Sequence, residues 1–569
     1  MFTRKIRKIA KGGFYKNRKK DIDPDEIFLD STNLPNFNVH QFEGRIEKSI
    51  SIRTIVFLVS FFCIIFFLFI FRVGDLQISK GKMYFTRSEN NIMRNTLIFA
   101  KRGVISDRND VKLAWNTENK NNPEFADRKY INTSGLSILL GYLKYPLKDK
   151  YGFYYSNAFV GKDGVEKFYD KELSGENGIR IVEVDALGKK QSENVIKPPV
   201  DGDSLKLSID SRIQSKFYDL ISSLAHRVGF SGGAGVIMDV HTGEILAMTS
   251  FPEYSSQILT DGDNSAINKY LKDSNKPFLD RVLDGLYAPG SIVKPYMAMA
   301  ALNEKIIDPL TNILGTAYIT VANPYDPAHP SIFKDWKAQG YVDMRHAIAV
   351  SSDVYFYEIG GGYEKQKGLG IANIERYMKE FGFGSAIPSD FFNSVSGTIP
   401  SPEWKALNFN GEKWNIGNTY HTSIGQYGFQ VSLIQVIRAV ASIANYGTLL
   451  SPTIILGDTS EIKNLKKLDF NYDYYKIVKE GMRLSVTEGV AMGLNTKDVE
   501  IAAKTGTAEL GVYKQFVNSW VTGFFPYDNP KYAFAVIMEK GPVKNTTGGV
   551  FVMRGLIDWM AVNTPEYLK

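Results

Sequence analysis

The chain has 569 residues, of which 44% are apolar and 23% charged, which excludes a disordered or fibrous protein and leaves room for two or three domains. The net charge of +7 is concentrated at the start, because residues 1–20 hold nine Lys and Arg and no acid. The other 549 residues carry about −2, so the excess positive charge concerns the tail alone. We expect no nucleic-acid partner.

Metal and redox chemistry have little support in the sequence. Cys63 is the only cysteine, which excludes an intramolecular disulfide and a cysteine metal cluster. The six histidines show no H-x-x-x-H or H-E-x-x-H spacing, the local signature of a hydrolytic metal site.

One stretch near the N-terminus is long and apolar enough to cross a membrane. Thr54–Phe71 contains 18 residues without a charge, and as a helix it would extend about 27 Å. Because it is apolar on all sides and no small-x-small cleavage site follows, an anchor is favoured over a core helix or a removed signal peptide. Basic residues stay on the cytoplasmic side, so we predict a cytoplasmic tail (1–50), a transmembrane helix (51–73) and an extracytoplasmic remainder.

The region 74–200 is polar, mixed in pattern and interrupted by glycine and proline, and it offers no catalytic constellation. Within it, 102–110 predicts a short strand that enters a polar turn, and 161–173 predicts an amphipathic segment. Adjacent prolines followed by aspartate and glycine mark a boundary near residue 200, beyond which we predict a second external domain, 201–569.

The second external domain has the pattern of an α+β fold. Two strand pairs are predicted, 234–239 with 244–248 and 519–525 with 532–538, and a helix is predicted over 431–445. Strands at both ends of the domain with helices between them predict a sheet that carries a helical subdomain.

The segment Tyr287–Pro295 holds the first candidate for catalysis. A Pro-Gly pair ends whatever precedes it, so a helix can begin at Ser291 and place Lys294 on the same face three residues later. A serine with an amine within reach is the arrangement of an activated nucleophile. Two other Ser-x-x-Lys pairs occur in the chain, Ser331/Lys334 and Ser460/Lys463. A solvated surface pair is therefore the alternative interpretation.

Two later clusters complete an ordered set. Ser351-Ser352-Asp353 follows Ser291 after 60 residues, and Lys504-Thr505-Gly506-Thr507 follows after a further 153, behind a β-like run at 499–503. A helix cap and an ordinary edge strand are the alternative interpretations of these two clusters. The ordered triple resembles the motifs S-x-x-K, S-x-N and K-[TS]-G of the penicillin-interacting serine transpeptidases.

The resemblance extends to one branch, the membrane-anchored class B penicillin-binding proteins of the elongation type. It implies a penicillin-binding-protein/β-lactamase-like transpeptidase domain with an antiparallel sheet, an extended pedestal (dimerisation-type) domain over 74–200, and no glycosyltransferase domain. The stretches that resemble this branch are 102–109, 161–169, 201–210, 333–336, 351–357, 423–426 and 504–509.

The chemistry that the resemblance implies is cofactor-free acyl transfer on peptidoglycan. Ser291 would attack a D-alanyl-D-alanine stem peptide, with Lys294 as base and Ser351 relaying the proton to the leaving amine. An ordinary lysine is neutral only about once in 2,500 at pH 7, so the surroundings must destabilise the ammonium by about 4 kcal/mol.

The strand motif would bind the rest of the substrate. Lys504 would complete the catalytic group, and with Thr505, Gly506 and Thr507 it would bind the terminal carboxylate of the stem peptide. The backbone N–H groups of Ser291 and Thr507 would form the oxyanion hole.

The sequence departs from the family pattern at several positions. Asp353 stands where the general motif has asparagine, and its charge would favour protonated lysines, so we expect it to be hydrogen-bonded or paired with a lysine. Some relatives hold a metal near 333–336, but Gln339 and Ser352 stand where its His and Cys would fall, and we expect no metal. Asp110 replaces a turn glycine, which aspartate tolerates.

The resemblance also implies partners. Stem peptides and β-lactams would react with Ser291, and a membrane-embedded SEDS-family polymerase with other rod-complex proteins would bind through the transmembrane helix and 74–200. A division-type transpeptidase or a D,D-carboxypeptidase shares the three motifs. A β-lactam sensor or a structural activator of a polymerase is the non-enzymatic alternative, which an intact lysine opposes because binding alone would not require it.

Overall fold

The protein is described by a computed structural model. The described residues are 51–85, 93–119, 124–149, 154–184, 190–323, 326–387, 389, 391–392, 394–458, 465–511 and 513–569, and the predicted tail (1–50) lies outside them. The chain divides into two compact units, Met1–Asn91 and Ile92–Lys569.

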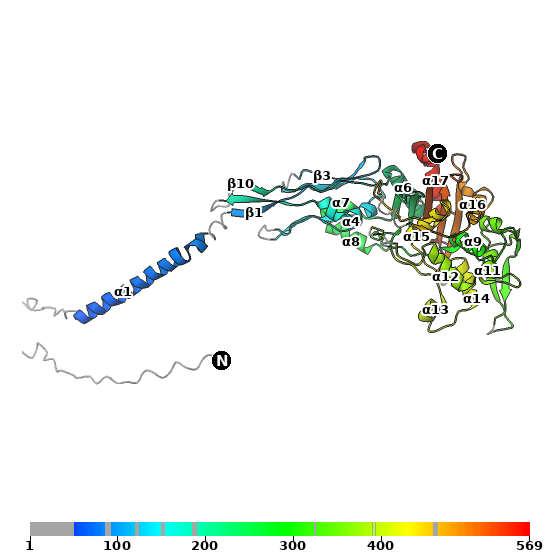
Figure 1. The fold of residues 1–569 in the computed structure, drawn as a ribbon, viewed down its shortest axis with the longest axis horizontal. Coiled ribbons are helices and arrows are strands. Elements are labelled where there is room, and N and C mark those ends of the chain that lie inside the picture. The colour runs from blue at the N-terminus through cyan, green and yellow to red at the C-terminus, as the bar shows by residue number, and fades with distance from the viewer. Residues whose placement is uncertain are drawn as a thin grey trace, which may run out of the picture. The chain divides into compact units, whose positions relative to one another are not determined.

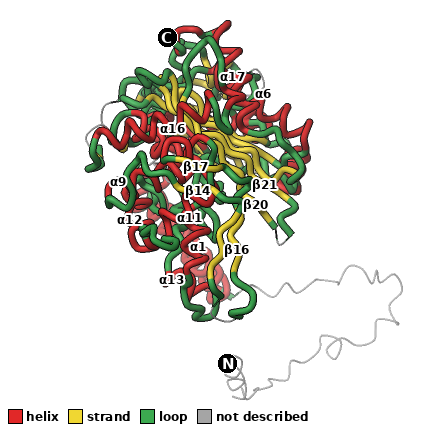
Figure 2. Tube along the Cα trace, turned by 90° about the vertical axis from the view of Figure 1, so that its right-hand side faces the viewer, coloured by secondary structure: helices red, strands yellow, loops and turns green. Residues whose placement is uncertain are grey.

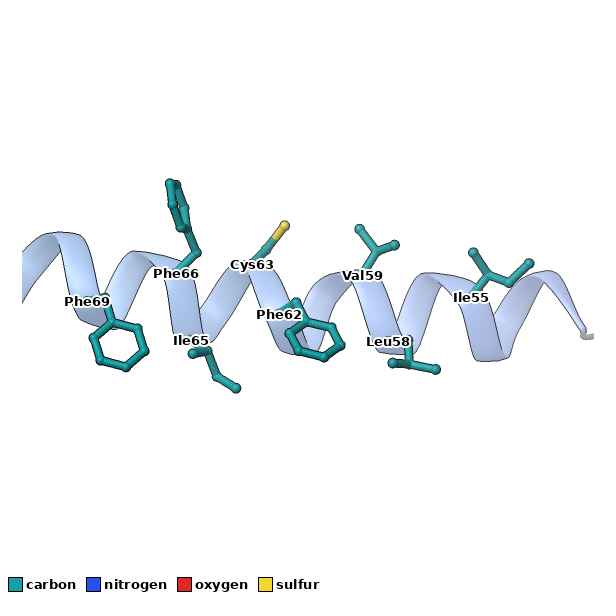
Figure 3. Close-up of a pocket in the computed structure, with 8 residues that line it drawn as sticks. All are labelled: Ile55, Leu58, Val59, Phe62, Cys63, Ile65, Phe66 and Phe69. Carbon is teal, nitrogen blue, oxygen red and sulfur yellow. The ribbon is translucent and has the colours of Figure 1, made fainter.

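A long apolar helix makes up most of the described part of the first unit. α1 (Ile52–Gly74) continues into a π-helical turn, η4 (Asp75–Ser79), and covers the span predicted over 51–73. Figure 3 shows the side chains from Ile55 to Phe69 pointing outward from this helix, and none of the α1 residues is buried. Its length and hydropathy fit a single-pass membrane anchor.

The second unit begins with a region of small sheets and short helices, the pedestal (93–206). Its main sheets have the strand orders β1-β9-β10 and β11-β2-β3-β4. Its elements are β1 (Met93–Ile98), β2 (Ile105–Ser106), β3 (Lys112–Thr117), β4 (Asp127–Tyr130), α3 (Ser137–Leu140), β5 (Leu143–Lys144), β6 (Leu147–Lys148), β7 (Tyr154–Ser156), β8 (Val160–Gly161), α4 (Gly164–Phe168), α5 (Asp170–Ser174), β9 (Gly178–Val184), β10 (Lys190–Lys197) and β11 (Leu205–Lys206).

The local predictions in the pedestal are confirmed. The strand expected within 102–110 is β2, and the following turn ends at Asp110, whose φ of 65° is the left-handed conformation that a glycine would favour. The amphipathic segment expected over 161–173 forms α4 and α5, and Val165 and Leu173 from these helices are buried.

The pedestal includes a segment that comes much later in the chain. α7 (Ser256–Asp261) and α8 (Asn264–Lys272) follow the second strand of the large sheet, yet α7 packs against β4, β5 and α3, and Figure 1 shows both helices in the pedestal region. The backbone N–H of Tyr130 donates to Gln257 Oε1 at 3.2 Å. The proposed boundary near residue 200 is therefore crossed by this returning segment.

The C-terminal part is built on a five-stranded antiparallel sheet with the order β13-β12-β22-β21-β20. Both predicted strand pairs are confirmed as neighbours in it. The strands are β12 (Gly232–Asp239), β13 (Ile245–Phe251), β20 (Ala502–Leu510), β21 (Phe516–Phe525) and β22 (Tyr532–Pro542). β20 lies at one edge, which leaves one side of this strand free for another group to approach.

Helices cover both faces of the sheet. Side chains alternate along each strand, so neighbouring apolar residues enter different cores. Val236 and Met238 face the larger apolar core and Ile237 faces the smaller one, where α6 and α17 pack (Figure 2). The other face is covered by α15 and, at β20, by α16, against which α9 packs. The helices are α6 (Ser211–Val228), α9 (Lys294–Asn303), α15 (Leu433–Ala444), α16 (Tyr472–Thr487) and α17 (Gly549–Asn563). The helix predicted over 431–445 is α15, and it is fully buried.

A helical subdomain is inserted between β13 and β20, as predicted. Its helices are α10 (Met344–Ala349), α11 (Asp353–Gly361), α12 (Gly370–Glu380), α13 (Pro402–Asn408) and α14 (Ile416–Ser423). Its short strands are β14 (Ile313–Gly315), β15 (Tyr318–Val321), β16 (Ser331–Lys334), β17 (Gly340–Val342), β18 (Thr448–Leu449) and β19 (Lys466–Lys467). The remaining turns are η5 (Gly290–Val293), η7 (Met492–Leu494) and η8 (Pro565–Tyr567). The α+β class with an antiparallel sheet flanked by helices is confirmed.

Candidate active site

Ser291 lies in a tight turn that leads directly into a buried helix. The 3-10 turn η5 contains Ser291, and α9 follows it without a break from Lys294. Gly290 has a φ of 58°, and a Cβ there would lie 2.9 Å from the carbonyl oxygen of Thr507. The glycine thus ends the preceding segment, as predicted, and lets the turn approach β20 closely.

Two neighbouring segments hold this turn in place. Trp520 Nε1 donates a hydrogen bond to the carbonyl oxygen of Ala288 at 3.0 Å, and the Gly290 N–H donates to the Gly425 carbonyl at 2.9 Å. A Cβ on Gly425 would come within 2.3 Å of Gly290 O, so only glycine fits there. The stretch 423–426 matched the family, but the sequence alone did not show that it supports the serine turn.

Ser351 occupies the short link between α10 and α11. The next residue, Ser352, caps α11, because its hydroxyl accepts the Tyr355 N–H at 3.2 Å. Ser351 itself has a φ of 57°, which is uncommon for serine and characteristic of functional sites. The helix-cap interpretation therefore holds for Ser352, whereas the Ser351 hydroxyl contacts Lys294 and Lys504.

Four of the predicted residues, Lys294, Ser351, Asp353 and Lys504, come together in one cluster. Lys294 Nζ donates to Asp353 Oδ1 at 2.6 Å, to the Ser351 carbonyl at 2.8 Å and to Ser351 Oγ at 3.3 Å. Lys504 Nζ lies 2.8 Å from Ser351 Oγ and donates to the Thr505 carbonyl at 2.9 Å. Both lysines are 0% exposed. The expected pairing of Asp353 with a lysine is confirmed.

The surroundings of the cluster are strongly desolvating. Burial lowers the pKa of Lys504 well below its usual value, and the neighbouring Lys294 lowers it further against the opposing effect of Asp353. A second carboxylate, Asp335, accepts hydrogen bonds from Ser352 Oγ at 2.8 Å and from the Val354 N–H at 3.1 Å. Asp335 lies in the matched stretch 333–336, and its role in fixing the serine link was missed by the sequence analysis.

The strand motif lies on the edge strand β20. Thr505 is half-buried and Thr507 is exposed, whereas Lys504 and Gly506 are buried, as the alternation of a strand requires. A Cβ on Gly506 would lie 2.9 Å from the Pro289 carbonyl oxygen, so this glycine lets β20 pass close to the serine turn. The run expected at 499–503 becomes a strand only from Ala502, where the pairing with β21 begins.

The other Ser-x-x-Lys pairs form no comparable arrangement. Ser331 and Lys334 lie on β16, where residues three apart point to opposite faces. The pair Ser460/Lys463 falls outside the described residues. Among the described residues, no group of three His, Cys, Asp or Glu could hold a metal. Ser352, at the expected position of a metal ligand, hydrogen-bonds Asp335 instead.

Comparisons with known proteins agree with this geometry. The family model of the penicillin-binding protein transpeptidase domain matches residues 233–551, and that of the penicillin-binding protein dimerisation domain matches residues 124–207. The peptidoglycan D,D-transpeptidase MrdA of Salmonella typhimurium is 30% identical over 76% of this chain and 72% of the relative. MrdA of Escherichia coli is 28% identical over 76% of this chain and 70% of the relative.

Solved structures share the same fold over most of their length. PBP2 of Pseudomonas aeruginosa, in complex with WCK 5153, superposes with a TM-score of 0.67 at 27% identity and covers 84% of this chain and 98% of that protein. PBP2 of Helicobacter pylori, in complex with MreC, superposes with a TM-score of 0.68 at 25% identity and covers 82% and 98%. The chain therefore belongs to the penicillin-binding protein transpeptidase family, in the branch whose curated members are named peptidoglycan D,D-transpeptidase.

Proposed function

We propose that the protein cross-links peptidoglycan during cell elongation, with Ser291 as the residue that forms the acyl-enzyme. The observation that carries this proposal is the cluster beside the serine turn. A hydroxyl, Ser351 Oγ, lies within hydrogen-bond distance of two buried lysine amines, and one of them, Lys294, is three residues from Ser291. A binding module would not require this proton-handling group.

The reaction is an exchange of one peptide bond for another, and therefore needs no cofactor. Ser291 Oγ attacks the carbonyl carbon of the penultimate D-alanine and passes its proton to the lysine–serine cluster. The C–N bond to the terminal D-alanine breaks, and the leaving amine takes a proton from Ser351. An amine of a neighbouring stem peptide then attacks the ester and releases Ser291.

Groups on the turn and on β20 position the substrate. The accessible Thr505 and Thr507 bind its terminal carboxylate, together with the strand's lysine and glycine. The backbone N–H groups of Ser291 and Thr507 stabilise the oxyanion, and the close approach of Gly290 to the Thr507 carbonyl supports this arrangement.

The decisive experiment is labelling of the full chain with a fluorescent penicillin. The wild type should be labelled covalently, and Ser291→Ala should lose the label completely. Ser331→Ala is the matched control, because it changes the other described Ser-x-x-Lys serine, and it should keep full labelling. An unlabelled wild type, or a labelled Ser291→Ala, would contradict the assignment.

Product analysis separates cross-linking from hydrolysis. Incubation with stem peptides and an amine acceptor should yield cross-linked dimers as the main product. Release of D-alanine with only shortened peptides would instead identify a D,D-carboxypeptidase, and localisation at midcell rather than along the side wall would identify a division enzyme.

The membrane helix and the pedestal serve as the binding surface for partners. PBP2 of Helicobacter pylori has been solved with MreC, and we extend this kind of association to the present chain, with a SEDS-family polymerase as the further partner. The tail (1–50) lies in the cytoplasm and the catalytic domain outside. Co-purification with the polymerase should be lost when 54–200 is exchanged and kept when only 1–50 is exchanged.

A further inference from the structure

The two lysines beside Ser351 have unlike partners. Lys294 contacts the carboxylate of Asp353 at 2.6 Å. Lys504 contacts only the Ser351 hydroxyl and the Thr505 carbonyl, and no carboxylate contacts it in the part of the chain that the structure describes. Two amines at similar depth thus differ in whether a carboxylate contacts them directly, although Asp353 also favours the ammonium form of Lys504 from farther away.

We propose that Asp353 holds Lys294 as the ammonium of the resting site and leaves Lys504 as its neutral amine, so that Lys504 is the final acceptor of the Ser291 proton. This inference rests on the proposed function and deepens it. It makes Asp353 a positioning residue, and it assigns to Lys504 a proton-carrying role besides substrate binding.

The hydrogen bonds fit this distribution of protons. An ammonium has three N–H donors, and Lys294 Nζ donates three bonds, to Asp353 Oδ1, the Ser351 carbonyl and Ser351 Oγ. Ser351 Oγ accepts from Lys294, so its own proton is free to point at Lys504 Nζ, 2.8 Å away. A neutral Lys504 can accept that proton with its lone pair, whereas an ammonium cannot.

The electrostatics point the same way. Lys504 is 0% exposed, and burial together with the Lys294 charge lowers its pKa well below the usual value. Asp335 interacts with Lys294, and Tyr357 and His421 interact with Asp353. Burial raises the pKa of Asp335 and of Tyr357 and lowers that of His421, so it opposes the charged form of each group. Asp353 is the carboxylate that contacts Lys294.

The proton path then runs through three transfers in order. Ser351 passes its hydroxyl proton to Lys504, Lys294 passes one to Ser351 Oγ, and the Lys294 amine, now neutral, takes the proton of Ser291 Oγ. Ser291 becomes the attacking alkoxide, Lys504 becomes an ammonium, and Lys294 and Ser351 end as they began. When the C–N bond breaks, Ser351 donates its proton to the leaving amine and takes one from the Lys504 ammonium. Lys504 is then a neutral amine again, so the protons balance.

The first test is the pH profile of acylation by a fluorescent penicillin, measured for the wild type and Asp353→Asn. Asparagine keeps a hydrogen-bond acceptor but removes the charge that favours both ammonium forms. Both limbs of the profile should therefore move to lower pH, by about one unit or more. A lower rate with an unmoved profile would show a merely structural role and overturn the inference.

Lys479→Met is the control that shows whether a buried lysine outside the active site contributes to the pH profile. Lys479 on α16 is another buried lysine, and burial lowers its pKa to about 8, so its titration falls in the same range. Its Nζ donates to the Ala444 carbonyl at 3.3 Å and lies over the rings of Tyr446 and Phe524, away from the active-site cluster. The profile of this variant should keep the wild-type limbs.

The second test is Lys504→Arg, which keeps a cation for the substrate carboxylate but cannot provide a neutral amine. Acylation should fall by about 100-fold or more, because a proton acceptor is lost. Lys479→Arg, which places the same bulkier group in another buried site, should stay within about 2-fold of the wild type. Retained acylation in Lys504→Arg would overturn the inference.

These outcomes are distinct from failure of the proposed function. An unlabelled wild type would remove the transpeptidase assignment itself, whereas a labelled wild type with an unmoved Asp353→Asn profile would remove only the proton distribution. If Lys504→Arg does not fold, as judged by its melting temperature, the Asp353→Asn profile decides.

Discussion

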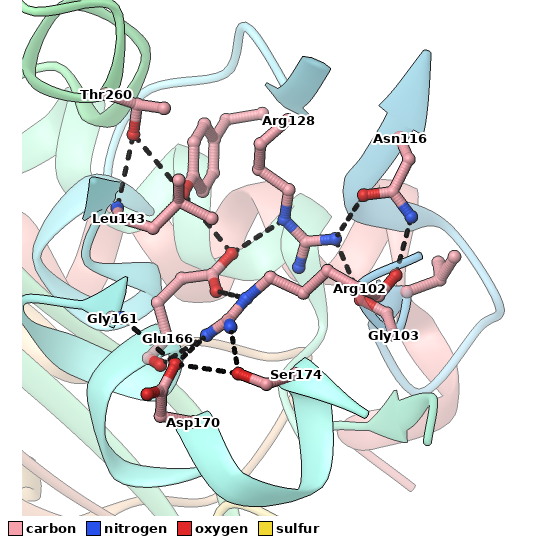
Figure 4. Close-up of polar contacts among 12 residues, drawn as sticks. Arg102, Gly103, Asn116, Arg128, Leu143, Gly161, Glu166, Asp170, Ser174 and Thr260 are labelled. Atoms are coloured by element: carbon pink, nitrogen blue, oxygen red, sulfur yellow. Dashed lines mark hydrogen bonds and ion pairs between the residues drawn. The ribbon is translucent and has the colours of Figure 1, made fainter. Parts of the chain in front are cut away.

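Two buried ionic clusters in this protein use different cations. In the pedestal, Arg102 and Arg128 share the carboxylate of Glu166 (Figure 4), with Nε–O distances of 2.5 and 2.7 Å. In the active site the cations are lysines, and one of them lacks a carboxylate among the described residues. Arginine cannot lose its proton in a protein, whereas a buried lysine can. The first cluster therefore has fixed charges and the second has movable protons.

The positive and negative charges of the pedestal cluster are equal in number. Arg102 also contacts Asp170 at 2.7 Å, and Tyr130 donates its hydroxyl proton to Glu166 at 3.2 Å. Burial lowers the pKa of Arg102, but the two carboxylates outweigh it and raise the pKa overall. Two guanidinium groups thus face two carboxylates, and the cluster joins β3, β4, α4 and the 102–110 turn.

Breaking the pedestal cluster should give the largest effect on stability. Glu166→Gln removes the charge shared by two buried arginines, so we expect the free energy of unfolding to fall by about 3–5 kcal/mol. Thermal unfolding of the full chain measures this loss. Glu172→Gln, which changes an exposed carboxylate in α5, is the matched control and should change stability by less than about 0.5 kcal/mol. Equal effects of the two variants would contradict a special role for Glu166.

A buried carboxylate without a cation should behave in the opposite way to Glu166. Glu253 accepts the N–H groups of Gly135 and Ser137 at 2.6 and 2.9 Å, and no cation contacts it within the described chain. Burial raises its pKa from 4.5 to about 7. The folded protein therefore binds the proton more tightly than the unfolded chain, and stability is full below about pH 4.5 and falls as the pH rises to about 7.

Glu253→Gln isolates the share of this pH dependence that belongs to one residue, because burial also raises the pKa of Asp280 and of Glu358 to about 7. We expect the fall in unfolding free energy across this window to be smaller by about 3 kcal/mol in Glu253→Gln than in the wild type. Denaturant unfolding at several pH values between 4.5 and 8 measures it. A slope that is unchanged in Glu253→Gln would place the titration on the other buried carboxylates.

Exchanging one cation type for the other gives the smallest and sharpest test of the comparison. Arg128→Lys keeps the charge beside Glu166 but loses the fork that also bonds the Gly103 carbonyl at 2.8 Å and Asn116 at 3.3 Å. We expect a loss of about 2 kcal/mol in unfolding free energy and no change in penicillin acylation. A change in the pH profile of acylation would instead link the two clusters.

Much of the catalytic domain was predictable because its signals are local. Hydrophobic periodicity located α15 and both strand pairs, and the Pro-Gly lead-in located the turn at Ser291. The charge at Asp353 was enough to predict that it is hydrogen-bonded or paired with a lysine, because a free carboxylate would favour the protonated lysines. These inferences need only neighbouring residues or simple electrostatics.

Other features depend on contacts between distant segments. Arg102 and Glu166 lie in two stretches that matched the family, yet nothing in either stretch shows that they meet across 64 residues. Asp335 and Gly425 likewise support the active site from separate elements. The packing of α7 on the pedestal could not be predicted, because its sequence is that of an ordinary surface helix.

The sequence by itself determined the chemical inventory of this protein: an apolar anchor, an α+β domain, and two serines, two lysines and an aspartate in a fixed order. Only the tertiary structure decided which lysine faces the aspartate. Both amines reach Ser351, but the start of α11 brings Asp353 to Lys294, and the alternation of β20 buries Lys504 with no described carboxylate in contact with it. Protonation follows from burial and from the nearest charge, and these are properties of the fold.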